Sequence, residues 1–269
     1  MRSRLYLVLD LETVPDSELQ PAPPRADQPP RKGLPAPLHH KVVCFAAAWA
    51  EYGSERIARP DPSSAWGTTW DAAYGDERDL LCQLSYLLSE LDPCVVTFSG
   101  RRFDMQVLAA RCFRNKVALP WYYNQPRFQS PRYRYSEERH LDLCDVLSDY
   151  GAGTMGSLDA WARACGMPGK DAFPGVDGSH VEQMIADGRL EDVAKYCVSD
   201  VVQLLAVFHR WRLLTGAASP EDHDDAQRAL LVRARGGDAF VGSWAERIRD
   251  EELLVRAPSE ARREPEAAE

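Results

Sequence analysis

The chain has 269 residues, of which 45% are hydrophobic and 27% charged, and its formal net charge at pH 7 is −9. This length and apolar content suffice for one substantial core, and we expect one main domain. The negative charge argues against a protein that coats nucleic acid through electrostatic attraction alone. It leaves room for a nuclease that binds phosphodiesters through metal ions held by carboxylates.

The cysteines and the hydropathy indicate the compartment. Seven cysteines occur without a CxxC pair, mostly inside apolar runs, which predicts reduced thiols packed in the core and no disulfide framework or zinc site. No apolar stretch approaches the roughly 18 to 20 residues of a membrane span, and the N-terminus has no apolar signal-peptide region. We therefore expect a soluble, cytoplasmic protein with no membrane partner.

The segment YLVLDLETVPD (6–16) reads as a buried strand that carries two acids. Successive side chains of a strand alternate between its faces, so Asp10 and Glu12 point to the same side. Buried carboxylates need an opposite charge or a metal ion, and no Lys or Arg is near in sequence. The alternative is that the strand ends at residue 9 and that both acids lie in a solvated turn.

Strands and helices alternate through the first half of the chain. In chain order we predict a Pro-rich loop at 17–38, strands at 41–52 and 55–60, a loop at 61–76, a helix at 80–91 and a strand at 94–100. The leucines of 80–91 fall at helical spacing, and Pro93 follows them.

Helices dominate the second half. In order we predict a helix at 103–113, an aromatic loop at 115–136, a strand or helix start at 140–150, and helices at 157–166 (with Ser157 as N-cap), 191–214, 220–234 and 238–254. This order suits an α/β sheet with additional C-terminal helices. We expect a main domain at 1–215, a helical extension at 216–256 and a disordered charged tail at 257–269.

Further acids stand where they could join the first pair. Asp104 follows a strand-to-helix loop in FSGRRFDMQVL, where a polar side chain can project over the sheet edge. Tyr196 and Asp200 in KYCVSDVVQLL are four residues apart, on one face of a helix. Four acids and a phenol could thus converge on one site.

These motifs, in this order, resemble DEDD-type 3′→5′ exonucleases of the ribonuclease H-like superfamily. They are DLET, an FD preceded by a Gly-containing loop, and a YxxxD helix; RYRYSEERHLDL and the PGK at 168–170 are further shared features. The chain is similar, over about 5–214, to the predicted exonuclease family related to the proofreading domain of family-B DNA polymerases. The resemblance implies a ribonuclease H-like mixed sheet flanked by helices. Tyr196, with Lys195 where a His-type enzyme has His, indicates the Tyr type, DEDDy.

The resemblance also implies the chemistry. Two divalent cations, Mg²⁺ or Mn²⁺, about 3.5 to 4 Å apart would drive phosphodiester hydrolysis. Asp10 would bridge them, Glu12 and Asp200 would complete the first, and Asp104 would hold the second through water. Tyr196 would orient the attacking water. The expected substrate is the 3′ end of single-stranded nucleic acid, DNA before RNA, and an unidentified replication or DNA repair protein is a conceivable partner.

Several other residues have two alternative interpretations each. Asp142 could cap or salt-bridge as well as touch metal, His140 could be structural or substrate-adjacent, and Lys170 could meet a phosphate or lie in solvent. Ser99 stands where the family usually has Asn, and it still donates and accepts a hydrogen bond with altered reach. Loop aromatics could stack bases or pin the loop to the core; they are Trp121, Tyr122, Tyr123, Phe128, Tyr133 and Tyr135.

Two other function classes compete with the exonuclease. A nuclease-fold nucleic-acid-binding or scaffold module without catalysis would lack a site carboxylate, and none is missing here. Simple helix packing is an alternative explanation for Tyr196, although Asp200 in register with it favours a role in the site. A phosphatase with an aspartyl nucleophile would need Asp two positions after the nucleophile, where this chain has Glu12, so we discount it.

Overall fold

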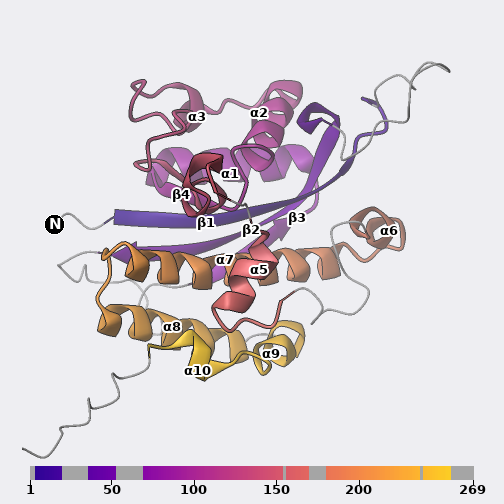
Figure 1. The fold of residues 1–269 in the computed structure, drawn as a ribbon. Coiled ribbons are helices and arrows are strands. Elements are labelled where there is room, and N and C mark those ends of the chain that lie inside the picture. The colour runs from indigo at the N-terminus through magenta and orange to yellow at the C-terminus, as the bar shows by residue number, and fades with distance from the viewer. Residues whose placement is uncertain are drawn as a thin grey trace, which may run out of the picture.

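The fold is built on a five-stranded mixed sheet (Figure 1). The computed structural model describes residues 4–19, 36–52, 69–153, 156–169, 180–236 and 239–255. The strands are β1 (Arg4–Pro15), β2 (His40–Tyr52), β3 (Thr69–Tyr74), β4 (Cys94–Thr97) and β5 (His140–Asp142). They lie in the order β3-β2-β1-β4-β5, in which β2 is antiparallel to β1 and β3, whereas β1, β4 and β5 are parallel.

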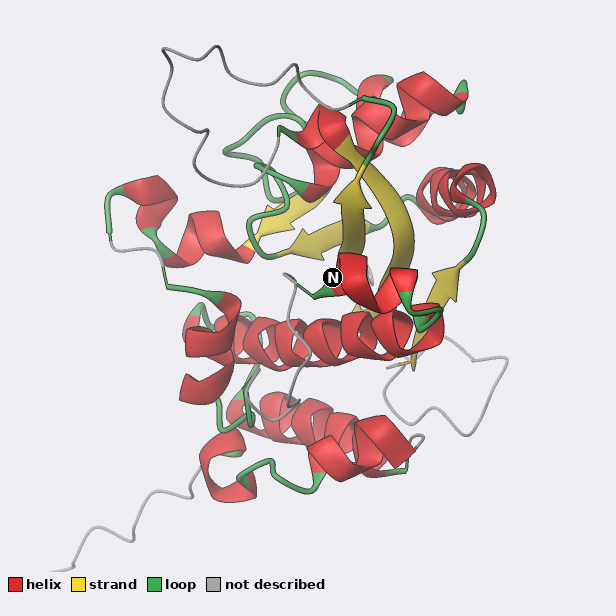
Figure 2. Ribbon diagram, turned by 90° about the vertical axis from the view of Figure 1, so that its right-hand side faces the viewer, coloured by secondary structure: helices red, strands yellow, loops and turns green. Residues whose placement is uncertain are grey.

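Helices cover both faces of this sheet (Figures 1 and 2). One face carries α1 (Glu77–Leu91), α2 (Asp104–Asn115) and α3 (Pro120–Tyr123), and the other carries the long α7 (Leu190–Leu214), with α8 (Pro220–Arg235) beyond it. The short helices are α4 (Leu143–Leu147), α5 (Leu158–Ala164), α6 (Val181–Ala186), α9 (Ala239–Ala245) and α10 (Asp250–Leu253), with 3-10 turns η1 (Pro37–His39) and η2 (Asp149–Gly151).

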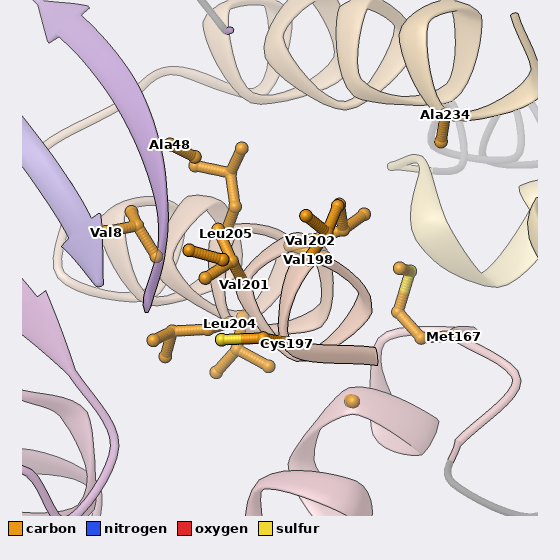
Figure 3. Packing of buried hydrophobic residues seen from close by; sticks show 14 of the residues in the cluster. Val8, Ala48, Met167, Cys197, Val198, Val201, Val202, Leu204, Leu205 and Ala234 are labelled. Carbon is orange, nitrogen blue, oxygen red and sulfur yellow. The ribbon is translucent and has the colours of Figure 1, made fainter. Parts of the chain in front are cut away.

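The alternation of β1 decides which side chains meet which helix layer. Leu7 and Leu9 are fully buried in the cluster that includes residues of α1 and α2. Val8 is buried in the opposite cluster, which α7 dominates; Figure 3 shows it beside α7 side chains. Because even-numbered side chains of β1 share one face, Asp10 and Glu12 point toward the layer of α7.

A buried ion cluster ties the end of β1 to α1 and α2. The guanidinium of Arg111 donates to both carboxylate oxygens of Glu77 at 2.7 Å and to Asp16 at 2.6 Å. Glu77 also accepts a hydrogen bond from the backbone N–H of Val42 in β2, at 2.8 Å. All three charged residues are buried, at 2%, 5% and 6% exposed for Arg111, Glu77 and Asp16. Nothing in the sequence pattern predicted this cluster.

Most of the expected elements are confirmed. The first strand does not end at residue 9: β1 continues to Pro15, and Asp10 and Glu12 pair with Ala46 and Cys44 of β2. The solvated-turn alternative is therefore wrong. Ser157 caps α5 as expected, since its hydroxyl accepts from the N–H of Ala160 at 3.1 Å. All seven cysteines are free thiols.

Some elements differ from the expectation. The region 61–76, expected as loop, contains β3, whose short sequence TWDAAY gains its strand structure by pairing with β2. The loop 115–136 contains α3, the region 140–150 is strand β5 followed by α4, the region 238–254 holds two short helices, and α6 was not predicted. The expected strand at 55–60, the tail at 257–269 and positions 20–35 of the Pro-rich loop lie outside the described residues. Across the described helices, none has the length and apolar character to span a membrane.

Candidate active site

The two acids of β1 form the centre of the candidate site. Asp10 and Glu12 lie on the α7 side of the sheet, both partly exposed. Their carboxylates and the thiol of Cys197 in α7 offer ligand atoms that all lie within 4.8 Å of one another. The Cys197 Sγ lies 3.5 Å from the backbone oxygen of Asp10 and 3.6 Å from its Oδ2. The three side chains could together hold a metal ion.

The parallel strands bring further groups to the same edge of the sheet. Because β1, β4 and β5 are parallel, the residues that follow β4 and β5 emerge at the edge toward which the second half of β1 runs. The loop after β4 turns through Ser99, which has a left-handed φ of 62°. Asp142, at the end of β5, holds this loop by accepting hydrogen bonds from the N–H groups of Ser99 (2.8 Å) and Arg101 (2.9 Å).

Asp104 is the first residue of α2 and is only 7% exposed. Burial, followed by the nearby Asp142 carboxylate, raises the pKa of Asp104 to about 7, although hydrogen bonds from its own N–H and from that of Leu11 act in the opposite direction. The hydrogen bond from Leu11 places the carboxylate of Asp104 against the backbone between Asp10 and Glu12. The structure thus brings the expected Asp104 to the expected strand.

The α7 residues lie along the face of this helix that meets β1. Asp200 is 4% exposed and accepts a hydrogen bond from Gln203 Nε2 at 3.2 Å. It follows Cys197 by three residues and Tyr196 by four, so all three share one helix face. Tyr196 is 1% exposed and belongs to the hydrophobic cluster of α7. The ring of Tyr196 therefore packs in the core.

Cys197 is the residue at this site that the sequence reasoning missed. Cys197 stands directly after Tyr196 in the YxxxD motif. This position is the one feature of the sequence that could indicate a place at the site. The cysteine pattern as a whole instead predicts core packing. Burial, then the neighbouring Cys44 thiol, then the charges of Asp10 and Glu12 raise the pKa of Cys197 well above its usual value. The tight group within 4.8 Å includes neither Asp104 nor Asp200.

Comparison with known families identifies the chain. The model of a family described as predicted 3′-5′ exonucleases related to the exonuclease domain of PolB matches residues 34–246. The chain belongs to this family. Membership confirms the expected enzyme class, a hydrolytic 3′-5′ exonuclease. The match begins after β1, the strand that carries Asp10 and Glu12.

Two solved structures are similar to this chain. The family B DNA polymerase from the hyperthermophilic archaeon Pyrobaculum calidifontis matches with a TM-score of 0.52 and 18% identity, over 87% of this chain and 29% of that chain. E. coli Exonuclease I in complex with a 5cy-dT13 oligonucleotide matches with a TM-score of 0.39 and 14% identity, over 79% of this chain and 45% of that chain. The polymerase match confirms the expected α/β fold, a mixed sheet flanked by helices. No curated protein matches the chain.

The structure also distinguishes between the two interpretations of Asp142 and of His140 in this exonuclease family member. Asp142 is an N-cap: besides holding the Ser99 loop it accepts from the N–H of Cys144 at 3.1 Å, which is the capping alternative. His140 is fully buried beside Thr97 Oγ1, 2.8 Å from its Nε2, and is structural. Burial lowers the pKa of His140 well below its usual value. Lys170 lies outside the described residues.

Proposed function

We propose that this protein is a metal-dependent 3′→5′ exonuclease that hydrolyses phosphodiester bonds at the 3′ end of single-stranded nucleic acid, DNA in preference to RNA. One observation carries the proposal: Asp10 and Glu12 share a face at the centre of the sheet, and their carboxylates, with the Cys197 thiol, offer ligand atoms that lie within 4.8 Å of one another. Acids gathered in this way repel one another unless a cation compensates.

The donor set suits hard divalent cations. Carboxylate oxygens of Asp10, Glu12, Asp104 and Asp200 would hold two such ions, Mg²⁺ or Mn²⁺, since both prefer oxygen ligands. When bound, the pair of ions supplies a hydroxide at neutral pH and neutralises the charge that develops on the phosphate and on the leaving oxygen. Cys197 adds one soft donor beside this set.

The chain's own groups position these acids. The N–H of Leu11 fixes the carboxylate of Asp104, Gln203 fixes that of Asp200 at 3.2 Å, and Asp142 fixes the loop that leads into α2. We assign to Tyr196 the orientation of the attacking water, through a hydroxyl that would reach the site from a ring packed in the core. A phenol with an ordinary pKa near 10 serves better as a hydrogen-bonding aligner than as a base.

A digestion time course tests the proposal. A 5′-labelled 20-nucleotide DNA and an RNA of the same sequence are incubated with the protein in Mg²⁺, in Mn²⁺ and in excess chelator. We expect the labelled strand to shorten one nucleotide at a time from its 3′ end in either metal, faster for DNA, and to persist in chelator. A strand that persists in all conditions while still binding the protein would instead favour a nuclease-fold binding module without catalysis. Internal cuts that appear first, or full activity in chelator, would contradict the proposal.

A further inference from the structure

A basic and aromatic surface adjoins the loop that leads into Asp104. The segment 121–136 contains three arginines, six aromatic residues and no acid, in a chain whose net charge is −9. It forms α3 and the loop that follows, on the α1 and α2 side of the sheet (Figure 1). We name the exposed arginines and aromatic residues of this segment, together with the exposed Arg102 of the loop before α2, the Arg–aromatic face; it consists of Arg102, Tyr123, Arg127, Phe128, Arg132 and Tyr135.

Five of the six aromatic residues of this segment divide into a buried and an exposed group, and Tyr133 is half-buried. Trp121 and Tyr122 are buried, at 2% and 7% exposed, and pack in the cluster with α1 and α2. Tyr123, Phe128 and Tyr135 are 56%, 65% and 63% exposed. The buried pair already anchors the segment, so anchoring does not explain the three exposed rings. Exposed flat rings on a basic surface are the platforms on which single-stranded bases stack.

The loop that carries the exposed rings is held in place. Phe128 packs edge-to-face on Tyr133, with ring centroids 5.3 Å apart, and Tyr135 packs against Tyr150 at 5.0 Å. Arg101 donates to the backbone oxygens of Pro131 at 2.7 Å and His140 at 2.6 Å. The rings are therefore presented in a fixed arrangement before any ligand arrives, which lowers the entropic cost of binding.

The arginines differ in what they already bind. Arg134 pairs with Asp145 at 2.7 Å and is part of the loop's internal structure. By contrast, no ion pair links Arg127 or Arg132 to a carboxylate among the described residues; each guanidinium lies over a ring, Arg127 at 5.7 Å from Phe128 and Arg132 at 5.1 Å from Tyr123. Guanidinium groups without carboxylate partners are suited to phosphate.

Arg132 lines two hollows in the surface. One hollow of about 360 Å³ is lined by Arg127, Arg132 and Tyr133 among others, and a second of about 240 Å³ by Arg101, Arg102 and Arg132 among others. Arg102 precedes Asp104 by two residues, so their Cα atoms are at most about 7 Å apart. The Arg–aromatic face therefore begins at the loop that positions Asp104.

We propose that the Arg–aromatic face binds the single-stranded nucleic acid on the 5′ side of the 3′ end held at the candidate active site. Bases stack on Tyr123, Phe128 and Tyr135, and phosphates pair with the arginines. This inference rests on the proposed function for the direction of the strand, but binding to the face requires no hydrolysis. Stacking and phosphate pairing are sequence-tolerant, which suits an enzyme that removes every base in turn.

The test measures binding without turnover. Fluorescence anisotropy in excess chelator follows 5′-labelled dT16, dT4 and rU16 on the full chain, its Arg127→Ala/Arg132→Ala variant and its Phe128→Ala/Tyr135→Ala variant. The matched control is Arg228→Ala/Arg233→Ala, which removes two exposed arginines from α8, beyond α7 and away from this face. Melting temperatures verify that all variants are folded.

We expect wild-type protein and the control to bind dT16 more tightly than dT4, and both face variants to lose at least roughly tenfold for dT16. The slope of log K against log salt should also fall by about 1.4 in the arginine variant, at roughly 0.7 for each lost phosphate contact on a single strand. The rU16 arm shows whether the face accepts RNA as well as DNA. Folded face variants with wild-type affinity and salt slope, or equal losses in the control, would overturn the inference. Digestion assays on the same proteins test the proposed function separately.

Discussion

Replacing Arg111 by Met tests how the end of β1 is held. Met keeps most of the side chain's length and removes the guanidinium, leaving the carboxylates of Asp16 and Glu77 buried at 6% and 5% exposed. Each keeps other donors: Glu77 keeps the Val42 N–H and Asn115 Nδ2, and Asp16 keeps the Glu18 N–H. The two carboxylates therefore do not pay the full cost of desolvation. We expect the free energy of unfolding to fall by about 3 to 5 kcal/mol, which is typical of breaking a buried ion pair.

Thermal and urea unfolding, each followed by circular dichroism, measure this loss. For a chain of this size it corresponds to a melting temperature lowered on the order of 10 °C. Arg114→Met is the control, because Arg114 is 34% exposed and lies 3.6 Å from the same Asp16 oxygen that Arg111 binds at 2.6 Å. Because this contact is long and Arg114 is partly exposed, we expect its loss to cost nearer to the about 0 to 1 kcal/mol of exposed pairs.

The pH dependence of the unfolding free energy is a second test of the Arg111→Met prediction. Burial pushes the pKa of Asp16 upward, but hydrogen bonds from Arg111 and from the Glu18 N–H outweigh it and hold the pKa below its usual value. Wild-type Asp16 therefore contributes stability above its unfolded pKa of about 3.9 and loses it only as the pH falls through the lowered folded value. Without the guanidinium, burial raises this pKa, so the variant gains stability on acidification from pH 7 to about 4. The gap between the two proteins should narrow over this range. A loss no larger than that of Arg114→Met, or a gap that is constant with pH, would refute the reasoning.

Three further substitutions test the site. Tyr196→Phe should lower kcat by roughly 10- to 10³-fold with little change in KM; a normal kcat with an altered melting temperature would leave Tyr196 a packing role alone. Cys197→Ser replaces a soft donor by a hard one, so activity in Mg²⁺ should persist while the Cd²⁺ concentration needed for half inhibition rises by about tenfold or more, and unchanged Cd²⁺ inhibition would remove the thiol from the site. Ser99→Asn should raise the melting temperature by about 1 to 3 °C, because Asn tolerates the left-handed φ better than Ser, whereas a lower melting temperature would show that the Ser hydroxyl is needed there.

The sequence revealed those parts of the site that depend on local periodicity. The alternation of β1 placed Asp10 and Glu12 on one face, and helical spacing placed Tyr196 and Asp200 together, because strand and helix periods act over a few residues. Asp104 could be located only as the residue after a loop. Its hydrogen bond from Leu11 depends on how the strands are ordered in the sheet.

Features that depend on distant partners could not be predicted. Arg111 meets Glu77 and Asp16 across 34 and 95 residues of sequence, and no periodic pattern links such positions. Ser99 has a left-handed φ in a loop that is held by hydrogen bonds to Asp142, which lies 43 residues later in the sequence. The short strand β3 forms because it pairs with the edge of β2. Its own sequence is too short to predict a strand.

The central claim, that the acids of β1 hold the catalytic metal ions, is tested most directly by Asp10→Asn in the 3′-end digestion assay. The substitution keeps the size of the side chain and removes its charge. The account predicts that hydrolysis in Mg²⁺ falls by at least about 10²-fold, while the melting temperature without metal stays equal or rises, because like charges no longer repel. Asp79→Asn, which removes an exposed acid from α1, should retain wild-type hydrolysis. An Asp10→Asn protein that is folded and shortens the strand at the wild-type rate would contradict the account.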